Sequence, residues 1–118
     1  MQAYPNIHVE VSEVITNDVS FSAIHALNIF RILQEACTNA LKHSEANLID
    51  VAFESNDSLR LSVKDNGTGI TDINYLNSGN GIKNMKLRAL ESGLYLSVEK
   101  NEPSGTIVSL TSEPLLHT

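Results

Sequence analysis

Three polar side chains, Glu35, Asn39 and Lys42, share one side of a predicted helix that runs from about Ser22 to His43. An α-helix turns by about 100° per residue, so steps of four and then three residues return to nearly the same side. That side holds a carboxylate, an amide and an ammonium group, although a purely structural helix could also turn such residues to water. The neighbouring side is apolar at helical spacing and is predicted to face the core, with Phe30, Leu33, Cys37, Ala40 and Leu41.

A second group of candidate residues lies in the stretch VKDNGTGI, residues 63 to 70. Asp65 ends an apolar strand and is followed by Gly67 and Gly69. A carboxylate at a buried strand end costs free energy unless a donor reaches it, and the exocyclic amine of a base would be such a donor. Glycines beside it would let a flat ring approach the backbone. The alternative is a glycine-rich turn in which the aspartate caps its own backbone.

A third motif, SGNGIKNMKLRAL, places Gly79 and Gly81 immediately before a predicted helix of about Ile82 to Ser92. Free N–H groups at a helix start, together with the helix dipole, form an anion site, and glycine lets a phosphate come close. The alternative is a loop whose glycines only permit the turn. The motif is neither a P-loop nor the dinucleotide pattern G-x-G-x-x-G, so a nucleotide would have to be held in another way.

Hydrophobic patterning places these motifs in a β-α-β-β-loop-α-β-β order. Ile7, Val9 and Val11 alternate with polar residues and predict a half-buried strand. Turn residues 55 to 58 predict an antiparallel hairpin between strands 47–54 and 59–63. The long stretch from Asp65 to Gly81 is predicted to be a functional loop. Gly93 is predicted to cap the second helix, and strands follow at 94–98 and 106–110. Two helices cannot cover both faces of five strands, which predicts a two-layer α/β sandwich.

Composition restricts the class of protein. The chain has 118 residues, 42% of them hydrophobic, and a net charge of −6, which predicts one domain over 1–118 with a tail from about residue 112. The excess of acidic over basic residues argues against a nucleic acid as a partner and against direct contact with an anionic membrane. No signal pattern or membrane-length apolar run occurs, and the single Cys37 is predicted to be a small buried hydrophobe in a reducing compartment. We therefore expect a cytoplasmic domain.

Four motifs occur in a fixed order: E-x-x-x-N-x-x-K-H on a helix, D-x-G-x-G after a strand, G-x-G at a second helix and a late P-S-G-T. From about Ile7 to Leu110 this set resembles the ATP-binding catalytic domain of sensor histidine kinases. These kinases belong to the GHKL superfamily, which includes gyrase, mismatch-repair ATPases and heat-shock chaperones. EACTNALKHSEA and GNGIKNMKLRAL look most like the nitrate-sensor and lipid-fluidity-sensor subfamily. The resemblance implies the Bergerat ATP-binding fold, with a mixed, largely antiparallel sheet and helices on one face.

The resemblance also implies a role for each matching residue. Asn39 matches a Mg²⁺ ligand, and Glu35 is expected to polarise the site or to reach Mg²⁺ through water. Lys42 and His43 match positions near the phosphates, and Asp65 matches the carboxylate that accepts from the adenine amine. The other positions expected to contact ATP are Gly67, Gly69, Ile70, Gly79, Gly81, Ile82 and Thr106.

By the same resemblance, the domain is expected to be an ATP-dependent protein-histidine kinase. It would transfer the γ-phosphoryl group from Mg-ATP to a histidine on a separate dimerisation and phosphoacceptor domain of the same kinase. A response regulator would act downstream. None of the four histidines lies in the H-[DE] context of that acceptor, so we expect upstream segments, including any membrane anchor, to belong to a longer protein. The alternative is a free-standing relative, such as an anti-sigma serine kinase or a hydrolytic ATPase.

Overall fold

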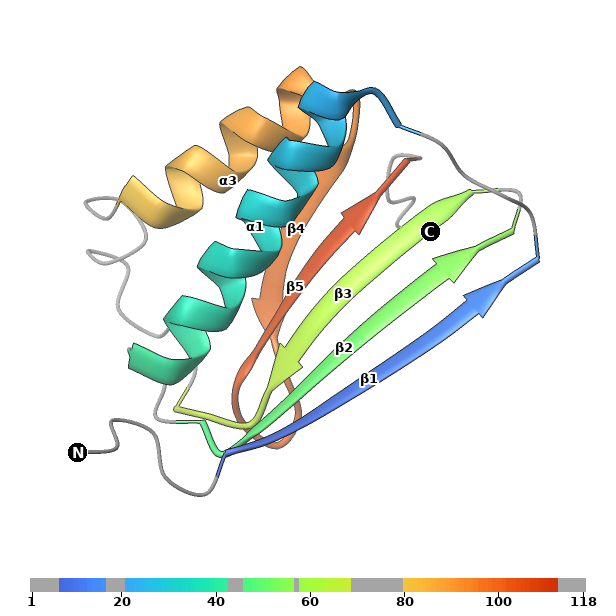
Figure 1. Cartoon of the computed structure of the whole chain (residues 1–118). Coiled ribbons are helices and arrows are strands. Elements are labelled where there is room, and N and C mark those ends of the chain that lie inside the picture. Colours follow the sequence, from blue (N-terminus) through green and yellow to red (C-terminus); the bar gives the residue numbers. More distant parts are fainter. Residues whose placement is uncertain (1–6, 17–20, 43–45, 57, 69–79, 113–118) are drawn as a thin grey trace, which may run out of the picture.

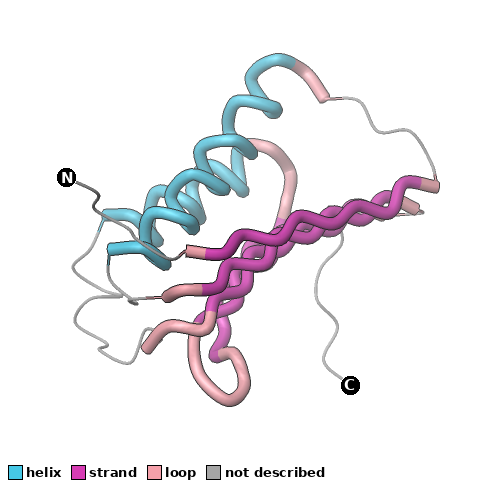
Figure 2. Tube along the Cα trace, turned by 60° about the horizontal axis from the view of Figure 1, so that its bottom comes forward, coloured by secondary structure: helices cyan, strands magenta, loops and turns pink. Residues whose placement is uncertain are grey.

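Two helices cover one face of a five-stranded sheet in the computed structural model, which describes residues 7–16, 21–42, 46–56, 58–68 and 80–112 (Figure 1). Seen along the sheet, both helices lie in a single layer above the strands (Figure 2). The elements in chain order are β1 His8–Ile15, α1 Ala23–Lys42, β2 Leu48–Ser55, β3 Leu59–Asp65, α3 Asn80–Glu91, β4 Tyr95–Lys100 and β5 Thr106–Thr111. The predicted two-layer α/β architecture and element order are confirmed.

The strands lie in the order β1-β2-β3-β5-β4. β1 and β2 are parallel and are joined through α1, as a parallel pair requires a crossover connection. The other pairs are antiparallel, which confirms a mixed, largely antiparallel sheet. In the predicted hairpin Ile49 lies opposite Asp65, so the carboxylate at the end of β3 has the core side of β2 as its neighbour.

Local side-chain and backbone chemistry sets the helix ends. The Ser22 hydroxyl accepts from the His25 N–H at 3.3 Å, which caps the start of α1. At the end of α3, Gly93 has a φ of +70°. Its N–H donates to the Leu90 carbonyl, and the Leu94 N–H donates to the Ala89 carbonyl, which is the Schellman arrangement. The predicted glycine cap is confirmed.

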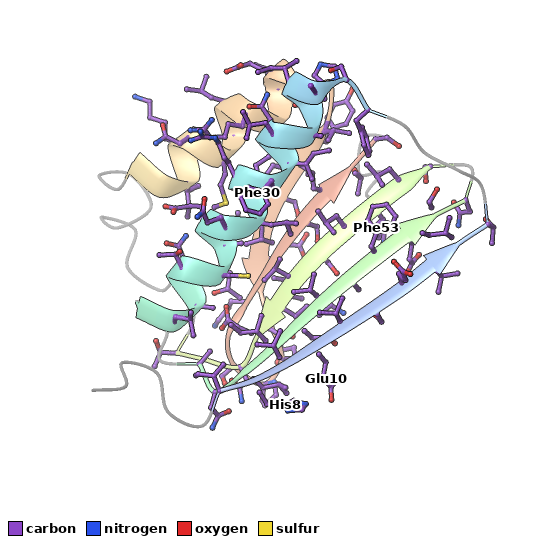
Figure 3. All side chains as sticks on the ribbon, in the orientation of Figure 1. His8, Glu10, Phe30 and Phe53 are labelled. Carbon is purple, nitrogen blue, oxygen red and sulfur yellow. The ribbon has the colours of Figure 1, made fainter. Side chains whose placement is uncertain are left out.

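The core lies between the helices and the central strands, where side chains from both layers meet (Figure 3). α1 packs on β3 and α3 packs on β4. The most deeply buried large side chains are Ile32, Ile49, Met85 and Leu110. Leu33, Cys37 and Leu41 are partly buried against this cluster. Cys37 is therefore half-buried rather than fully buried, and burial raises the pKa of its thiol.

Two predictions about burial are wrong. Phe30 was predicted to face the core, yet 59% of its surface is exposed (Figure 3). Phe30 precedes the buried Ile32 by two residues, which corresponds to a rotation of about 200° around α1. This rotation places Phe30 close to the side of the helix opposite Ile32. β1 was predicted to be half-buried, yet all its residues are exposed, including Val9 at 52% and Val11 at 74%. β1 is the edge strand farthest from the helices, so neither helix covers it (Figure 1).

Candidate functional site

A small cavity lies between the helix layer and the sheet, and five elements contribute its walls. Its volume is about 10 Å³, room for one water molecule. The lining residues are Ala36 and Asn39 of α1, Val63 and Asp65 of β3, Ile82 and Met85 of α3, Val98 of β4, and Thr106 and Val108 of β5. The fold therefore brings together a carboxylate, an amide and a hydroxyl among apolar side chains.

Asp65 is the charged group among the described residues that line this cavity. It is 6% exposed at the last position of β3, and its carboxylate accepts from the Gly67 N–H at 2.9 Å. Burial raises the pKa of Asp65, and the backbone N–H groups of Gly67 and Thr106 offset part of that rise. These two donors thus do not compensate fully for the hydration that the carboxylate loses on burial. A further hydrogen-bond donor would stabilise its charged form.

Thr106 supplies an unpartnered hydroxyl to the same cavity. The residue is 4% exposed, and its Oγ1 has no hydrogen-bond partner among the described residues. A buried hydroxyl without a partner costs free energy, which a ligand with a matching polar atom would recover. Asp65 and Thr106 together can bind a flat molecule that carries a donor and a second polar atom on one edge.

Two asparagines that sequence reasoning missed hold Asp65 in place. The Asn66 carboxamide oxygen accepts from the N–H groups of Asn47 and Leu48, at 3.1 and 3.0 Å, which ties the end of β3 to the start of β2. The Asn101 amide donates to the Asp65 carbonyl at 2.9 Å. Both side chains act on backbone groups distant in sequence, so only the position of Asn66 inside D-N-G could have drawn attention to it.

The predicted polar side of α1 divides between two surfaces. Asn39 is 7% exposed and lines the cavity. Glu35 lies one turn earlier and lines a groove of about 220 Å³ between α1 and α3, together with Arg31, Gln34, Thr38, Asn84, Met85 and Arg88. We call this the α1–α3 groove. The structure therefore brings Asn39, but not Glu35, together with Asp65, Ile82 and Thr106.

The remaining predicted site residues lie at the edge of the described structure or outside it. The sequence predicts that Gly81 lies before the second helix. In the structure α3 begins at Asn80, so Gly81 lies inside the first helical turn. Its N–H is still among the first four of the helix, which have no intrahelical acceptor. Lys42 ends α1, but its side chain is not described. His43, Gly69, Ile70 and Gly79 lie outside the described residues.

Two kinds of feature are absent from the described part of the chain. In those ranges, no three His, Cys, Asp or Glu side chains come together as a metal site. Neither described helix has the length and apolar character needed to cross a membrane.

The sequence profile of the histidine kinase-, DNA gyrase B- and HSP90-like ATPases matches residues 24–115. The chain belongs to this ATPase family. The resemblance drawn from the four motifs is thereby confirmed, and the ATPase-family match extends over all the elements that line the cavity.

Curated relatives and solved structures agree with this assignment. The sensor protein VraS of Staphylococcus aureus is 38% identical over 84 residues, which cover 70% of this chain and 24% of VraS. The chain thus spans about a quarter of the length of the curated relatives it matches. The histidine kinase domain of the blue-light activated kinase of Erythrobacter litoralis EL346 superposes with a TM-score of 0.74 at 27% identity, over 91% of this chain and 54% of that one. The ATP-binding domain of PrrB from Mycobacterium tuberculosis shares the fold, with a TM-score of 0.70 at 21% identity over 90% of this chain and 79% of that one.

Proposed function

We propose that this domain binds ATP with Mg²⁺ and transfers the γ-phosphoryl group to a histidine of a separate dimerisation and phosphoacceptor domain. The observation that carries the proposal is the pair formed by the buried Asp65 carboxylate and the unpartnered Thr106 hydroxyl in one cavity of a chain from this ATPase family. That pair offers an acceptor for an exocyclic amine and a second polar contact beside it.

Adenine fits this chemistry better than guanine. Asp65 accepts from the adenine amine, whereas guanine has a carbonyl oxygen at that position and would be repelled by a carboxylate. The apolar walls formed by Ala36, Val63 and Val108 would pack against the ring. Because the cavity holds only about 10 Å³, binding requires a wall to move. Met85 is the most adaptable lining residue, since its side chain is unbranched and has three rotatable bonds.

Asn39 is the residue we propose as the Mg²⁺ ligand. It is buried and lines the cavity, and no cluster of carboxylates in the described ranges competes for a metal. A hard cation that uses phosphate oxygens, water and one protein oxygen suits such a donor set. Glu35 would act through water, and Lys42 and His43, with the glycines at 79 and 81, would neutralise and hold the phosphates.

The acceptor lies on another domain in this proposal. VraS is named a sensor protein, and the Erythrobacter relative is named a histidine kinase. We propose that residues 1–118 form the single catalytic domain of such a kinase, that the helical phosphoacceptor domain is its direct partner, and that a response regulator receives the phosphoryl group. Positioning and charge neutralisation dominate phosphoryl transfer, so the domain alone is expected to turn over ATP slowly.

Titration calorimetry with ATP, ADP and GTP, with and without Mg²⁺, tests the proposal. Asp65→Asn should weaken ATP binding by about 1.5–3 kcal/mol, roughly ten- to 150-fold, and should lower the ATP/GTP affinity ratio, because an amide can turn to donate. Asn39→Ala should abolish the gain in affinity that Mg²⁺ provides and spare part of the adenine binding. Asp50→Asn is the matched control, since Asp50 alternates with the core-facing Ile49 and Val51 on β2.

Two results would contradict the assignment. An unchanged ratio of ATP to GTP affinity in Asp65→Asn would contradict the assignment of the cavity to adenine. Rapid ATP hydrolysis by the isolated chain, abolished by Glu35→Gln, would instead indicate a hydrolytic ATPase.

A further inference from the structure

Two helices form the walls of the α1–α3 groove. These helices, α1 and α3, contact each other and come closest where α1 begins and α3 ends (Figure 1). The Asn28 amide of α1 donates to the Ser92 hydroxyl after α3 at 3.1 Å, which fixes the two helices at one end. Side chains on paired helices hold their relative positions better than side chains on loops. A volume of about 220 Å³ leaves room for a small ligand group.

The groove carries more positive than negative charge, although the whole chain has a net charge of −6. Arg31 and Arg88 line it from opposite helices, and Glu35 is the one acidic residue among the described residues that line it. Within the described part of the chain, none of these three side chains belongs to an ion pair; the single ion pair there joins His8 and Glu10 on β1. Two guanidinium groups thus line one space, and neither forms an ion pair with Glu35, the acidic side chain of the same space.

The neutral lining of the groove consists mainly of hydrogen-bond donors. Gln34, Thr38 and Asn84 add two carboxamides and a hydroxyl to the two guanidinium groups. Guanidinium groups bind the oxygens of phosphate or carboxylate in a fork, and neutral amides and hydroxyls complete such a shell. This set of side chains is therefore suited to a small oxyanion and unsuited to an apolar ligand.

The groove and the cavity are adjacent. Met85 lines both and is 1% exposed, so this side chain forms part of the wall between them. An oxyanion in the groove would lie near the proposed nucleotide without occupying the adenine cavity.

We infer that the α1–α3 groove is an oxyanion site that takes a phosphoryl group, bound by Arg31 and Arg88 and weakened by Glu35. Free inorganic phosphate and the terminal phosphoryl group of a bound nucleotide share this chemistry. Only the second source rests on the proposed function, and the experiment distinguishes the two.

Inorganic phosphate is the probe, titrated into the 118-residue chain at constant ionic strength and followed by NMR. The double variant Arg31→Gln/Arg88→Gln should weaken phosphate binding by about tenfold or more, because charge-assisted hydrogen bonds of about 1.5–3 kcal/mol are lost. Glu35→Gln should strengthen it several-fold, since it removes the only negative charge that the described residues bring to the groove. Lys83→Gln removes a positive charge from an exposed position of α3 outside the groove and should change binding by less than about twofold. Melting temperatures check that each variant is folded.

The source of the phosphoryl group follows from nucleotide affinities of the same proteins. A fall in the ATP/ADP affinity ratio in the double variant assigns the groove to the terminal phosphoryl group, and an unchanged ratio assigns it to free phosphate. If the double variant binds phosphate as wild type does, or if Lys83→Gln loses as much affinity, the inference is wrong. Phosphate binding by the wild-type chain without any binding of ATP or ADP would overturn the proposed function alone.

Discussion

Gly105 is the backbone position on which the cavity depends most directly. It precedes β5 and has a φ of +110°, a conformation that L side chains rarely adopt. A Cβ atom there would overlap the Asp65 carbonyl oxygen, and it would lie 2.7 Å from the Asp65 carbonyl carbon and 3.0 Å from the Asn66 Cα. All three neighbours are backbone atoms of the segment that carries the site carboxylate, so they cannot move aside as the end of a flexible side chain would.

Gly105→Ala should therefore be strongly destabilising. Backbone strain alone costs about 1–3 kcal/mol, and relief of the overlap requires the start of β5 to separate from the end of β3. We expect a total loss of about 3–5 kcal/mol in the free energy of unfolding, a large share of the 5–15 kcal/mol typical of a domain. The same displacement would separate Thr106 from Asp65, so the affinity for ATP should fall as well.

Gly93→Ala is the matched control, because Gly93 also has a positive φ, +70°, but nothing lies within 4 Å of the added Cβ. It should cost about 1–2 kcal/mol from strain alone and leave ATP affinity unchanged. Urea unfolding at 25 °C, followed by circular dichroism, measures both losses, and calorimetry measures nucleotide binding. Equal losses of stability in the two variants, within about 0.5 kcal/mol, would refute the close-approach argument.

Three further substitutions test the roles given to burial. Because burial raises the pKa of Asp65 above its ordinary 3.8, this carboxyl favours the folded state fully only below that value, and its contribution is lost as pH rises through the raised pKa. The ligand-free Asp65→Asn protein should therefore gain stability relative to wild type as pH rises from about 4 to 7, and a pH-independent difference in denaturant unfolding would contradict this. Ile32→Ala should cost about 2–5 kcal/mol, whereas Phe30→Ala should cost less than about 1 kcal/mol; thermal unfolding that reversed this order would disprove the assignment of the buried side of α1.

Features that depend on neighbours in the chain could be predicted from the sequence. The turn residues 55 to 58 predicted the β2–β3 hairpin, and a glycine after a helical pattern predicted the cap at Gly93, because both rest on local backbone geometry. The motif around Asp65 predicted a carboxylate at a buried strand end, and the structure has it there with 6% exposure. The family followed from four such motifs in order, and the profile match confirms it.

Features that depend on which surfaces meet were decided by the tertiary structure. The apolar alternation of β1 does not reveal that this strand lies at an uncovered edge, and the apolar spacing around Phe30 does not reveal which part of α1 contacts the sheet.

The site shows the same division. The sequence supplied the types of the polar groups, a carboxylate at 65 and an amide at 39. Packing decided that Asn39 lines the cavity and that Glu35, one turn away, faces the groove beside two arginines. Met85 lines both spaces only because α1 and α3 pack against each other, and Asn66 holds the strand end only because β3 returns next to β2. These contacts join residues far apart in the chain, and periodicity within a single segment carries no information about its partner.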